Sequence, residues 1–107
     1  MTDARDAILE EMVRRLVEAY EPERIWLFGS RARGNAGPDS DYDLLVVVSD
    51  NAASERRREL LAYDVLWGTG RAADVIVWTE SAFERRTRVP SSLPATVRRE
   101  GRVLYAA

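Results

Sequence analysis

The sequence predicts an α/β or α+β domain in which helices cover a small β-sheet. Two kinds of hydrophobic pattern support this fold class. In some segments apolar residues recur at three- and four-residue steps, as in amphipathic helices, and in others they form short continuous runs, as in buried strands. Glycine, proline and small polar residues separate these segments. The predicted order is helix, strand, strand, helix, strand, helix, helix, strand.

The first helix is expected from Asp3 to Tyr20, followed by a strand. Its apolar positions lie on one face, with acids and arginines between them: Ile8, Leu9, Met12, Val13, Leu16, Val17 and Tyr20. Pro22 should end this helix, because the residue before a proline disfavours helical geometry. We expect a buried strand from Arg24 to Phe28, and Gly29 should end that strand.

The centre of the chain predicts a loop, a strand, a helix and another strand. Turn-forming residues fill positions 34–40, and the apolar run from Tyr42 to Val48 predicts the second strand. A second long helix is expected from about Ala53 to Trp67, because glycines at 68 and 70 would stop it. A third strand is expected from about Ala72 to Trp78.

Two shorter helices and a final strand are expected after the third strand. Thr79 or Ser81 should cap the first of these helices, since Ser81 and Glu84 match a capping box and Pro90 would end the helix. A serine at 91 or 92 would start the second helix, which a glycine at 101 would end.

The chain should close with a short strand from Arg102 to Tyr105. No repeat, low-complexity tract or linker divides the sequence. We therefore expect residues 1–107 to form one domain.

The composition excludes several kinds of chemistry. The chain contains no cysteine and no histidine, and all 16 of its basic residues are arginine. Thiol or imidazole catalysis, thiolate or imidazole zinc sites, a Schiff-base lysine and the Walker P-loop are therefore excluded. Only oxygen ligands remain for a metal ion, and these suit Mg²⁺ or Mn²⁺.

The charge pattern bears on partners and location. The formal net charge is -2, so no overall field favours nucleic acid, and direct contact with nucleic acid is not expected. The first 20 residues carry many charges, and no apolar run approaches the length of a membrane span. We expect no signal peptide, no membrane span and a cytoplasmic location.

A Gly-Ser pair and two aspartates lie between the first two predicted strands. Asp41 and Asp43 are two residues apart at the start of a strand, so their side chains should share one face. Two such carboxylates can hold two divalent ions about 3.5 to 4 Å apart, an arrangement that assists nucleotidyl transfer. Gly29 and Ser30 offer close backbone approach and a hydroxyl, which suit a polyphosphate. The alternative is a polar strand end with solvated acids, but the Gly-Ser pair and its ten-residue spacer favour the metal site.

Asp74 lies in an apolar run, where an unpaired acid would destabilise the sheet. On a neighbouring strand it could complete the metal site and accept the proton of an attacking hydroxyl. The alternative is an acid at the start of a strand, paired with Arg71 or another arginine. We favour the catalytic interpretation.

Arginines near the Gly-Ser pair are candidates for binding phosphate. Arg31 and Arg33 could neutralise phosphate charge, because a guanidinium matches phosphate oxygens in a bidentate fork. The alternative for both is a surface pair with a nearby acid. The run Arg56-Arg57-Arg58 is more typical of a solvated helix face than of a nucleic-acid contact.

Gly29-Ser30, the ten residues that follow, Asp41-Tyr42-Asp43 and the later Asp74 resemble the signature of the nucleotidyltransferase superfamily related to DNA polymerase beta. The chain looks most similar to the minimal nucleotidyltransferase (MNT) domains, and the resemblance covers essentially its whole length. It implies the nucleotidyltransferase fold, a small mixed sheet covered by helices. By the same resemblance, Gly29 and Ser30 contact the nucleotide triphosphate. Asp41 and Asp43 bind two Mg²⁺ ions, for which Mn²⁺ could substitute, and Asp74 activates the acceptor.

MNT domains of this size are similar to the antitoxins of modules whose toxin is an all-helical HEPN ribonuclease. The resemblance implies transfer of AMP from ATP to a tyrosine of that toxin. A domain without an acceptor-binding lobe must take its acceptor from outside, which agrees with a protein acceptor. Two alternatives stay open. The acceptor could be a small-molecule hydroxyl, with a homo-oligomer building the pocket, or the chain could be a non-catalytic antitoxin that neutralises the toxin by binding.

Overall fold

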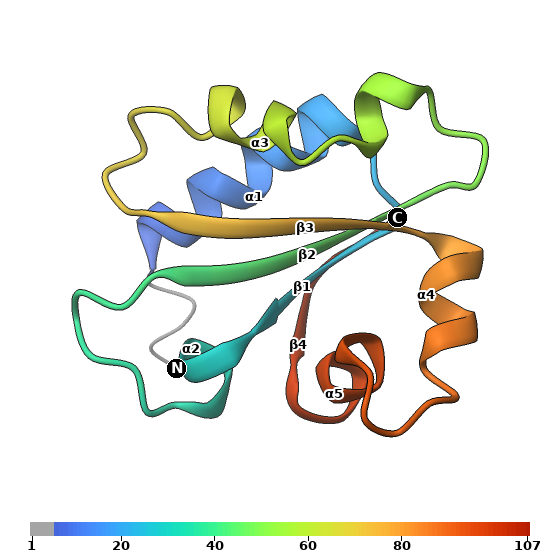
Figure 1. Ribbon diagram of the computed structural model, residues 1–107. Coiled ribbons are helices and arrows are strands. Elements are labelled where there is room, and N and C mark those ends of the chain that lie inside the picture. Colours follow the sequence, from blue (N-terminus) through green and yellow to red (C-terminus); the bar gives the residue numbers. More distant parts are fainter. Residues whose placement is uncertain (1–5) are drawn as a thin grey trace.

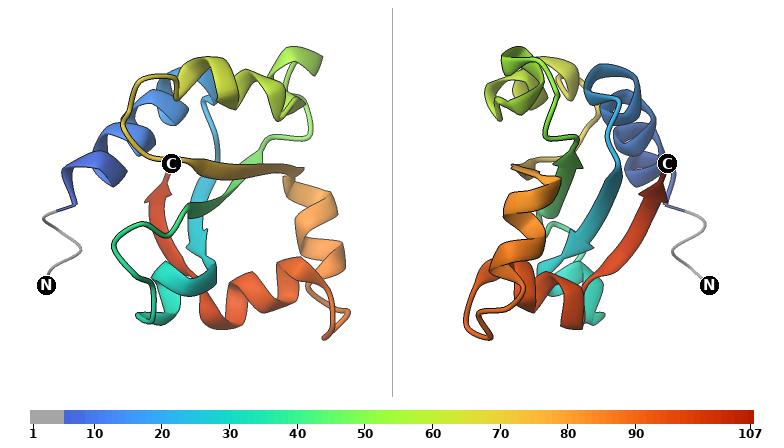
Figure 2. Two further views of the ribbon diagram at one scale, coloured as in Figure 1. Left: turned by 60° about the vertical axis from the view of Figure 1, so that its left-hand side comes forward. Right: turned by 90° about the vertical axis from the view of Figure 1, so that its right-hand side faces the viewer.

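The computed structural model describes residues 6–107, which form a four-stranded sheet with helices on both faces (Figure 1). Helices α1 and α3 lie on one face of the sheet, and α4 and α5 lie on the other, as both views in Figure 2 also show. The elements are α1 (Ala7–Tyr20), β1 (Arg24–Phe28), α2 (Gly29–Arg33), β2 (Tyr42–Val48), the 3₁₀ helix η2 (Ser54–Arg57), α3 (Leu60–Val65), β3 (Ala73–Thr79), α4 (Glu80–Arg86), α5 (Leu93–Glu100) and β4 (Arg102–Ala106).

The sheet is mixed, with strand order β3-β2-β1-β4. Strand β1 is antiparallel to β2 and β4, whereas β2 and β3 are parallel. A parallel pair needs a crossover connection, and the segment that contains η2 and α3 provides it. The predicted α/β fold class is confirmed. Because β2 and β3 run in the same direction, their first residues, Tyr42 and Ala73, meet at one end of the sheet.

Each face of the sheet has its own core, because side chains alternate along a strand. The core under α1 and α3 is the larger one, and its buried residues include Leu9, Met12, Leu16, Tyr20, Ile25, Leu27, Tyr42, Leu44, Val46 and Val48. The core under α4 and α5 contains Trp26, Leu45, Val47, Phe83 and Val97. Strand β2 is therefore buried along its whole length except at Asp43.

The start of α1 differs from the prediction. The helix begins at Ala7, and the carboxylate of Asp6 caps it by accepting a hydrogen bond from the Leu9 N–H at 3.0 Å. The predicted helix starts at Asp3, but residues 3–5 lie outside the part of the chain that the structure describes. The helix ends at Tyr20, as predicted, and strands β1 and β2 have their predicted bounds.

The predicted long helix from Ala53 to Trp67 is wrong. Its residues form η2 and then α3, and Arg58 between them has an extended backbone. The buried Tyr20 hydroxyl donates to the Arg58 carbonyl at 2.7 Å. A distant side chain thus satisfies a carbonyl that a continuous helix would bond internally.

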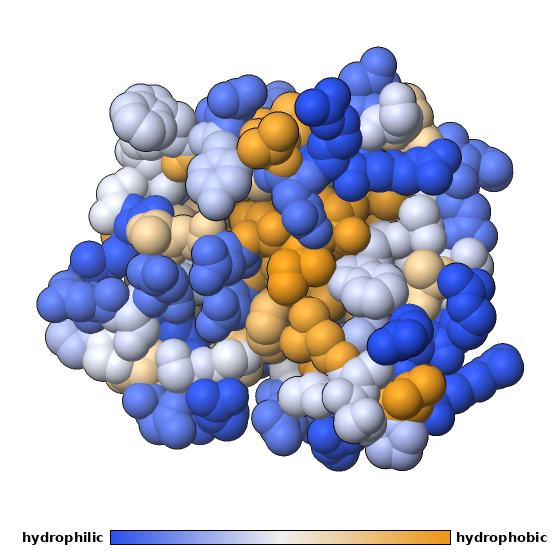
Figure 3. Space-filling view, viewed as in Figure 1, coloured by the Kyte–Doolittle hydropathy of each residue, from blue (hydrophilic) through white to orange (hydrophobic). Residues whose placement is uncertain are grey.

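Strand β3 is an edge strand whose apolar side chains are only half-buried. Figure 3 shows a hydrophobic strip across the middle of the side on which β3 lies, with hydrophilic residues around it. The Glu59 carboxylate accepts a hydrogen bond from the Val77 N–H of this strand at 3.1 Å. A charged side chain on an edge amide opposes pairing with another strand.

The caps of α4 and α5 test two more predictions. Of the two predicted caps of α4, Thr79 takes the N-cap position, but its side chain makes no cap hydrogen bond. Ser81 lies inside the helix, which begins at Glu80, and its N–H donates to the Asp50 carboxylate at 3.0 Å. The cap comes from a tertiary contact, which the local sequence does not reveal. Ser92 does cap α5, through the Ala95 N–H at 3.2 Å, and the final strand forms as expected. No helix within residues 6–107 has the length and apolarity needed to cross a membrane.

Candidate active site

Asp43 and Asp74 lie beside each other on neighbouring strands. Each is the second residue of its strand, and the parallel register of β2 and β3 pairs them directly. Adjacent strands are about 4.8 Å apart, so carboxylates that share a face come close together. The residues just before them, Tyr42 and Ala73, pack on the α1/α3 core, so both acids point to the α4/α5 face.

Asp74 is exposed and lies beyond the apolar part of β3. The alternative interpretation paired it with Arg71. That arginine instead lies 3.5 Å from the carboxylate of Asp39, which is 93% exposed. Among the described residues, no salt bridge or hydrogen bond engages the Asp74 carboxylate. It is therefore available to a ligand.

Asp41 lies one residue before β2 and is exposed. The alternation along the strand puts its side chain on the same side as Asp43. The negative charge of Asp41 also raises the pKa of Asp43, which agrees with two neighbouring carboxylates. The site therefore contains two acids from β2 and its approach, and one from β3.

The surroundings of Asp43 disfavour its negative charge. Partial burial is the largest cause of its raised pKa, and the charges of Asp74 and Asp41 add to it. Arg33 opposes these effects and lowers the pKa. Additional positive charge beside Asp43 would stabilise its ionised carboxylate. A divalent cation can provide that charge.

Gly29 lies directly against Asp43, and two features require glycine there. Its φ of +75° is in the left-handed region, which side chains disfavour. A Cβ on Gly29 would also lie 3.0 Å from Cγ and 3.3 Å from Cβ of Asp43, and closer still to its Oδ2. The sequence predicts that this glycine allows a phosphate to approach the backbone. The structure shows that the absence of a side chain allows the Asp43 carboxylate to approach.

Ser30 and Arg33 lie on α2, a short helix that the sequence analysis missed. The Ser30 hydroxyl makes no hydrogen bond to any residue from 6 to 107. The Arg33 side chain is exposed, and its charge acts on Asp43. Both side chains are thus free to meet a ligand beside Asp43.

Arg31 does not have the free guanidinium that phosphate binding requires. Its Nε and Nη2 donate to the Ser40 carbonyl at 3.0 and 2.7 Å, and Nη2 also lies 3.4 Å from the Pro38 carbonyl. Of the two arginines considered for phosphate, the structure leaves only Arg33 available.

The donor set suits a hard divalent cation. Carboxylate oxygens are the ligands that Mg²⁺ and Mn²⁺ prefer. No three acidic side chains within residues 6–107 converge closely enough to form a complete metal-holding group. This agrees with the exposure of Asp41 and Asp74, which packing does not hold in place. Asp43, crowded by two other acids, is the group whose charge a cation would compensate.

Comparison with known families identifies the kind of domain that carries these residues. The family model described as a nucleotidyltransferase domain matches residues 8–102. The chain belongs to this family. No curated protein matches the sequence.

Solved structures show that this nucleotidyltransferase domain shares its fold with toxin-antitoxin proteins. A chain in the crystal structure of a toxin-antitoxin with AMP-PNP is 22% identical, with a TM-score of 0.53. A chain of the toxin-antitoxin MntA-HpeT is 19% identical, with a TM-score of 0.57, in a variant with two aspartates replaced by glutamate. Each match covers 92% of this chain and 73% of the other. At these identities the likeness establishes the fold.

The structure adds two residues that sequence reasoning missed. Tyr42 separates the two motif acids and is buried, and its hydroxyl donates to the Asp6 carboxylate at 2.6 Å. The Arg31 guanidinium lies 4.0 Å above the Tyr42 ring. An aspartate just before an amphipathic helix signals an N-cap, but nothing local links it to Tyr42.

The run of arginines at the end of η2 lies away from these acids, with Arg58 just beyond the helix. Arg56 forms a salt bridge with Glu21 at 2.9 Å, and Arg57 donates to the Ala52 carbonyl at 3.1 Å. Glu21 directly follows α1, beside the end of the sheet opposite Asp43. These contacts agree with a solvated, structural role.

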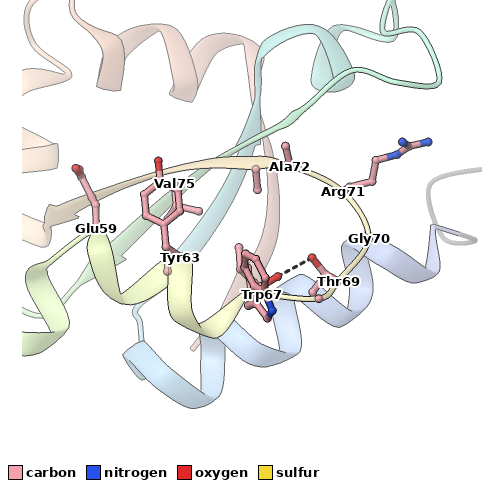
Figure 4. Close-up of a pocket in the computed structure, with 12 residues that line it drawn as sticks. Glu59, Tyr63, Trp67, Thr69, Gly70, Arg71, Ala72 and Val75 are labelled. Atoms are coloured by element: carbon pink, nitrogen blue, oxygen red, sulfur yellow. Dashed lines mark hydrogen bonds between the residues drawn. The ribbon is translucent and has the colours of Figure 1, made fainter.

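A cavity of about 300 Å³ lies between α3 and β3, outside the predicted site (Figure 4). Tyr63 and Trp67, exposed by 68% and 84%, stand at this cavity, and Val75 lines it from the strand. Asp74 points to the other face of the sheet. The cavity therefore does not contribute to the cluster of acids.

Proposed function

We propose that this nucleotidyltransferase domain transfers AMP from ATP to a hydroxyl of a partner protein, a tyrosine of a HEPN ribonuclease toxin. One observation carries the proposal. Gly29 lies against Asp43, and Asp43 is paired in register with Asp74. The proposed nucleotide turn, metal ligand and base therefore meet at one end of the sheet.

The triphosphate would lie beside Gly29 and Ser30. The free Ser30 hydroxyl can donate to a phosphate oxygen. Arg33 can pair with a second oxygen through its guanidinium, because no hydrogen bond or salt bridge within residues 6–107 engages its side chain. Ser30 follows Gly29, which lies against Asp43, and the charge of Arg33 acts on Asp43, so these two groups would place the α-phosphate near the acids.

Asp41 and Asp43, with Asp74, would hold Mg²⁺ or Mn²⁺, in the two-ion arrangement that the family resemblance implies. When bound, such ions neutralise phosphate charge and make the α-phosphate more susceptible to attack. The raised pKa of Asp43 supports this assignment, since crowded carboxylates need a compensating positive charge.

Asp74 would act as the general base. Its exposed carboxylate would accept the proton of the acceptor hydroxyl as the oxygen attacks the α-phosphorus. A new oxygen–phosphorus bond forms, the bond between the α- and β-phosphates breaks, and pyrophosphate leaves. Positioning of the two reactants would supply much of the rate enhancement.

Two features support a protein acceptor. Asp41 and Asp74 are both exposed, so a large partner can approach them. Both solved structures described above are of toxin-antitoxin systems, one of them with AMP-PNP, an ATP analogue. The experiment must separate this proposal from two alternatives. In one the acceptor is the hydroxyl of a small molecule, and in the other the domain neutralises the toxin by binding alone.

Intact-mass spectrometry of a HEPN partner, after incubation with this domain, ATP and Mg²⁺, tests the proposal. We expect the mass of one or more AMP groups on the partner, and none with Asp43→Asn. The modified residue, mapped by peptide sequencing, should be a tyrosine. An unmodified toxin whose ribonuclease is still inhibited, also by Asp41→Asn and Asp43→Asn, would leave only inhibition by binding. An unmodified and uninhibited toxin would contradict both.

A further inference from the structure

The loop between α2 and β2 has few contacts of its own with the sheet. Most of residues 34–40 are exposed. The Ser40 N–H donates to the Gly37 carbonyl at 3.2 Å, and the Gly37 N–H donates to Ser40 Oγ at 3.0 Å. These bonds shape a local turn, but they do not connect it to the site. The salt bridge from Arg71 to Asp39 of this loop is a weak surface contact, because the Asp39 side chain is 93% exposed. Something else must set the position of Asp41, which follows directly.

Arg31 connects this loop to the rest of the molecule. Two of its nitrogens converge on the Ser40 carbonyl at 3.0 and 2.7 Å, and one of them also reaches the Pro38 carbonyl. A guanidinium presents its donors in a rigid planar fork, so two bonds to one oxygen restrict its direction as well as its distance.

The guanidinium is held in turn by Tyr42, on the face of the sheet that α1 covers. It stacks 4.0 Å above the ring of Tyr42, which is 3% exposed. The Tyr42 hydroxyl donates to Asp6, which caps α1. A continuous set of contacts therefore runs from the first helix through a buried tyrosine to the loop.

Ser40 is the last residue before the first acid of the site. Its carbonyl belongs to the same planar peptide as the Asp41 nitrogen, so holding that oxygen orients the backbone of Asp41. Within residues 6–107, no side chain bonds to the Asp41 carboxylate. Its direction therefore depends on this backbone.

We infer that Arg31 is a positioning residue: it fixes the peptide before Asp41 and so places Asp41 beside Asp43, and it does not bind phosphate. This inference rests on the proposed function, in which the two acids share a metal ion. Loss of Arg31 should therefore weaken metal binding and leave the metal-free affinity for the nucleotide unchanged. Arg33, on the same helix, should behave in the opposite way.

The experiment compares Arg31→Met and Arg31→Lys with Arg57→Met. Arg57 makes the same kind of bond, to the Ala52 carbonyl at 3.1 Å, but at a distant loop. Amide hydrogen exchange of Ser40 and Tyr42 measures whether the loop is held. Titration with Mn²⁺ alone measures the metal site, and a fluorescent ATP analogue in EDTA measures metal-free nucleotide binding. Urea midpoints show that each variant is folded.

Arg31→Met should speed the exchange of both amides and raise the Mn²⁺ dissociation constant by about tenfold or more, as loss of a residue that orients a metal ligand does. Lysine should give an intermediate effect, because it keeps a cationic donor nitrogen but lacks the planar fork of the guanidinium. Arg57→Met should match the unmodified protein in both measurements. Metal-free nucleotide affinity should fall for Arg33→Met and stay unchanged for Arg31→Met.

Unchanged exchange in a folded Arg31→Met variant would overturn the inference. So would a loss of metal-free nucleotide affinity equal to that of Arg33→Met, which would make Arg31 a phosphate ligand. If the unmodified protein binds no Mn²⁺, the proposed function fails. In that case the exchange rates alone decide whether Arg31 holds the loop.

Discussion

The two faces of the sheet differ most at the start of β2. Tyr42 and Asp43 are consecutive residues, but Tyr42 lies under α1 with 3% of its surface exposed. Asp43 lies on the opposite face, where the core under α4 and α5 begins only at Leu45. We call the face on which α1 buries Tyr42 the closed face, and the face that leaves its carboxylates accessible the open face.

This difference shows how one strand serves stability and chemistry together. The closed face contributes apolar burial and the Asp6–Tyr42–Arg31 contacts, which hold the backbone around the acids. The open face presents Asp43 in register with Asp74. Variants in the apolar core of the closed face should change stability, and variants of the acids on the open face should change activity. The following predictions test that division, from the largest expected effect to the smallest.

The largest effect is expected for Asp43→Asn on the open face. Removing this charge should lower kcat/KM for AMP transfer by about a hundredfold to a thousandfold, comparable to the loss of one group that stabilises the transition state. The fold should persist, because burial and neighbouring acids already disfavour this charge. Activity assays and circular dichroism together check the result.

The same variant has a pH signature in metal-free buffer. The pKa of Asp43 is raised in the folded protein, so this group contributes stability at low pH that is lost as pH rises through that pKa. Asp43→Asn should therefore be at least as stable as the unmodified protein at pH 7. A marked loss of stability at neutral pH would contradict the inferred environment of Asp43.

On the closed face, Leu44→Ala should act on stability instead. Leu44 is fully buried between the sheet and α1, and its truncation should cost about 2 to 5 kcal/mol of unfolding free energy. Urea unfolding measures this loss. At urea concentrations below the unfolding transition, kcat/KM per folded molecule should change by no more than about threefold, because Leu44 does not face the acids. A tenfold change would correspond to about 1.4 kcal/mol of transition-state stabilisation. A larger fall would mean that the two faces are not separable.

Gly29→Ala tests the contact between the turn and Asp43, and Gly34→Ala is its matched control. Both glycines have positive φ, so each substitution should cost about 1 kcal/mol of stability. Only at Gly29 would the new methyl group collide with Asp43, whereas nothing lies within 4 Å at Gly34. We expect activity to fall by about tenfold or more at Gly29, as misplacement of a reacting group does. Equal losses at the two positions would show that backbone strain alone is responsible.

The smallest effect is expected for Tyr42→Phe. The ring stays under Arg31, but the hydrogen bond to Asp6 is lost, which should cost about 1 kcal/mol. Burial raises the pKa of Tyr42 to about 12, so the native protein should lose stability as pH rises from about 10 to 12. Unfolding measured across this range should show a shallower decline for the variant. Identical slopes would mean that Tyr42 does not titrate in this way.

Some elements could be predicted because their signals are local. The sequence predicts β1 and β2 at their observed bounds, since each apolar run lies between clear turn or proline signals. Other elements depend on distant residues. The break at Arg58 involves Tyr20, and the cap of α4 involves Asp50. Helix α2 has no apolar periodicity that a sequence pattern could detect.

The sequence by itself determined the available chemistry: oxygen ligands, a Gly-Ser pair, and Asp41 and Asp43 at the spacing that shares one face of a strand. Only the tertiary structure decided that Asp74 pairs with Asp43, that Gly29 lies against Asp43, and that Arg31 holds Ser40. The physical reason is the range of the forces involved. Residue type and local periodicity are properties of neighbouring residues, whereas register and contacts between strands arise only when the whole sheet assembles.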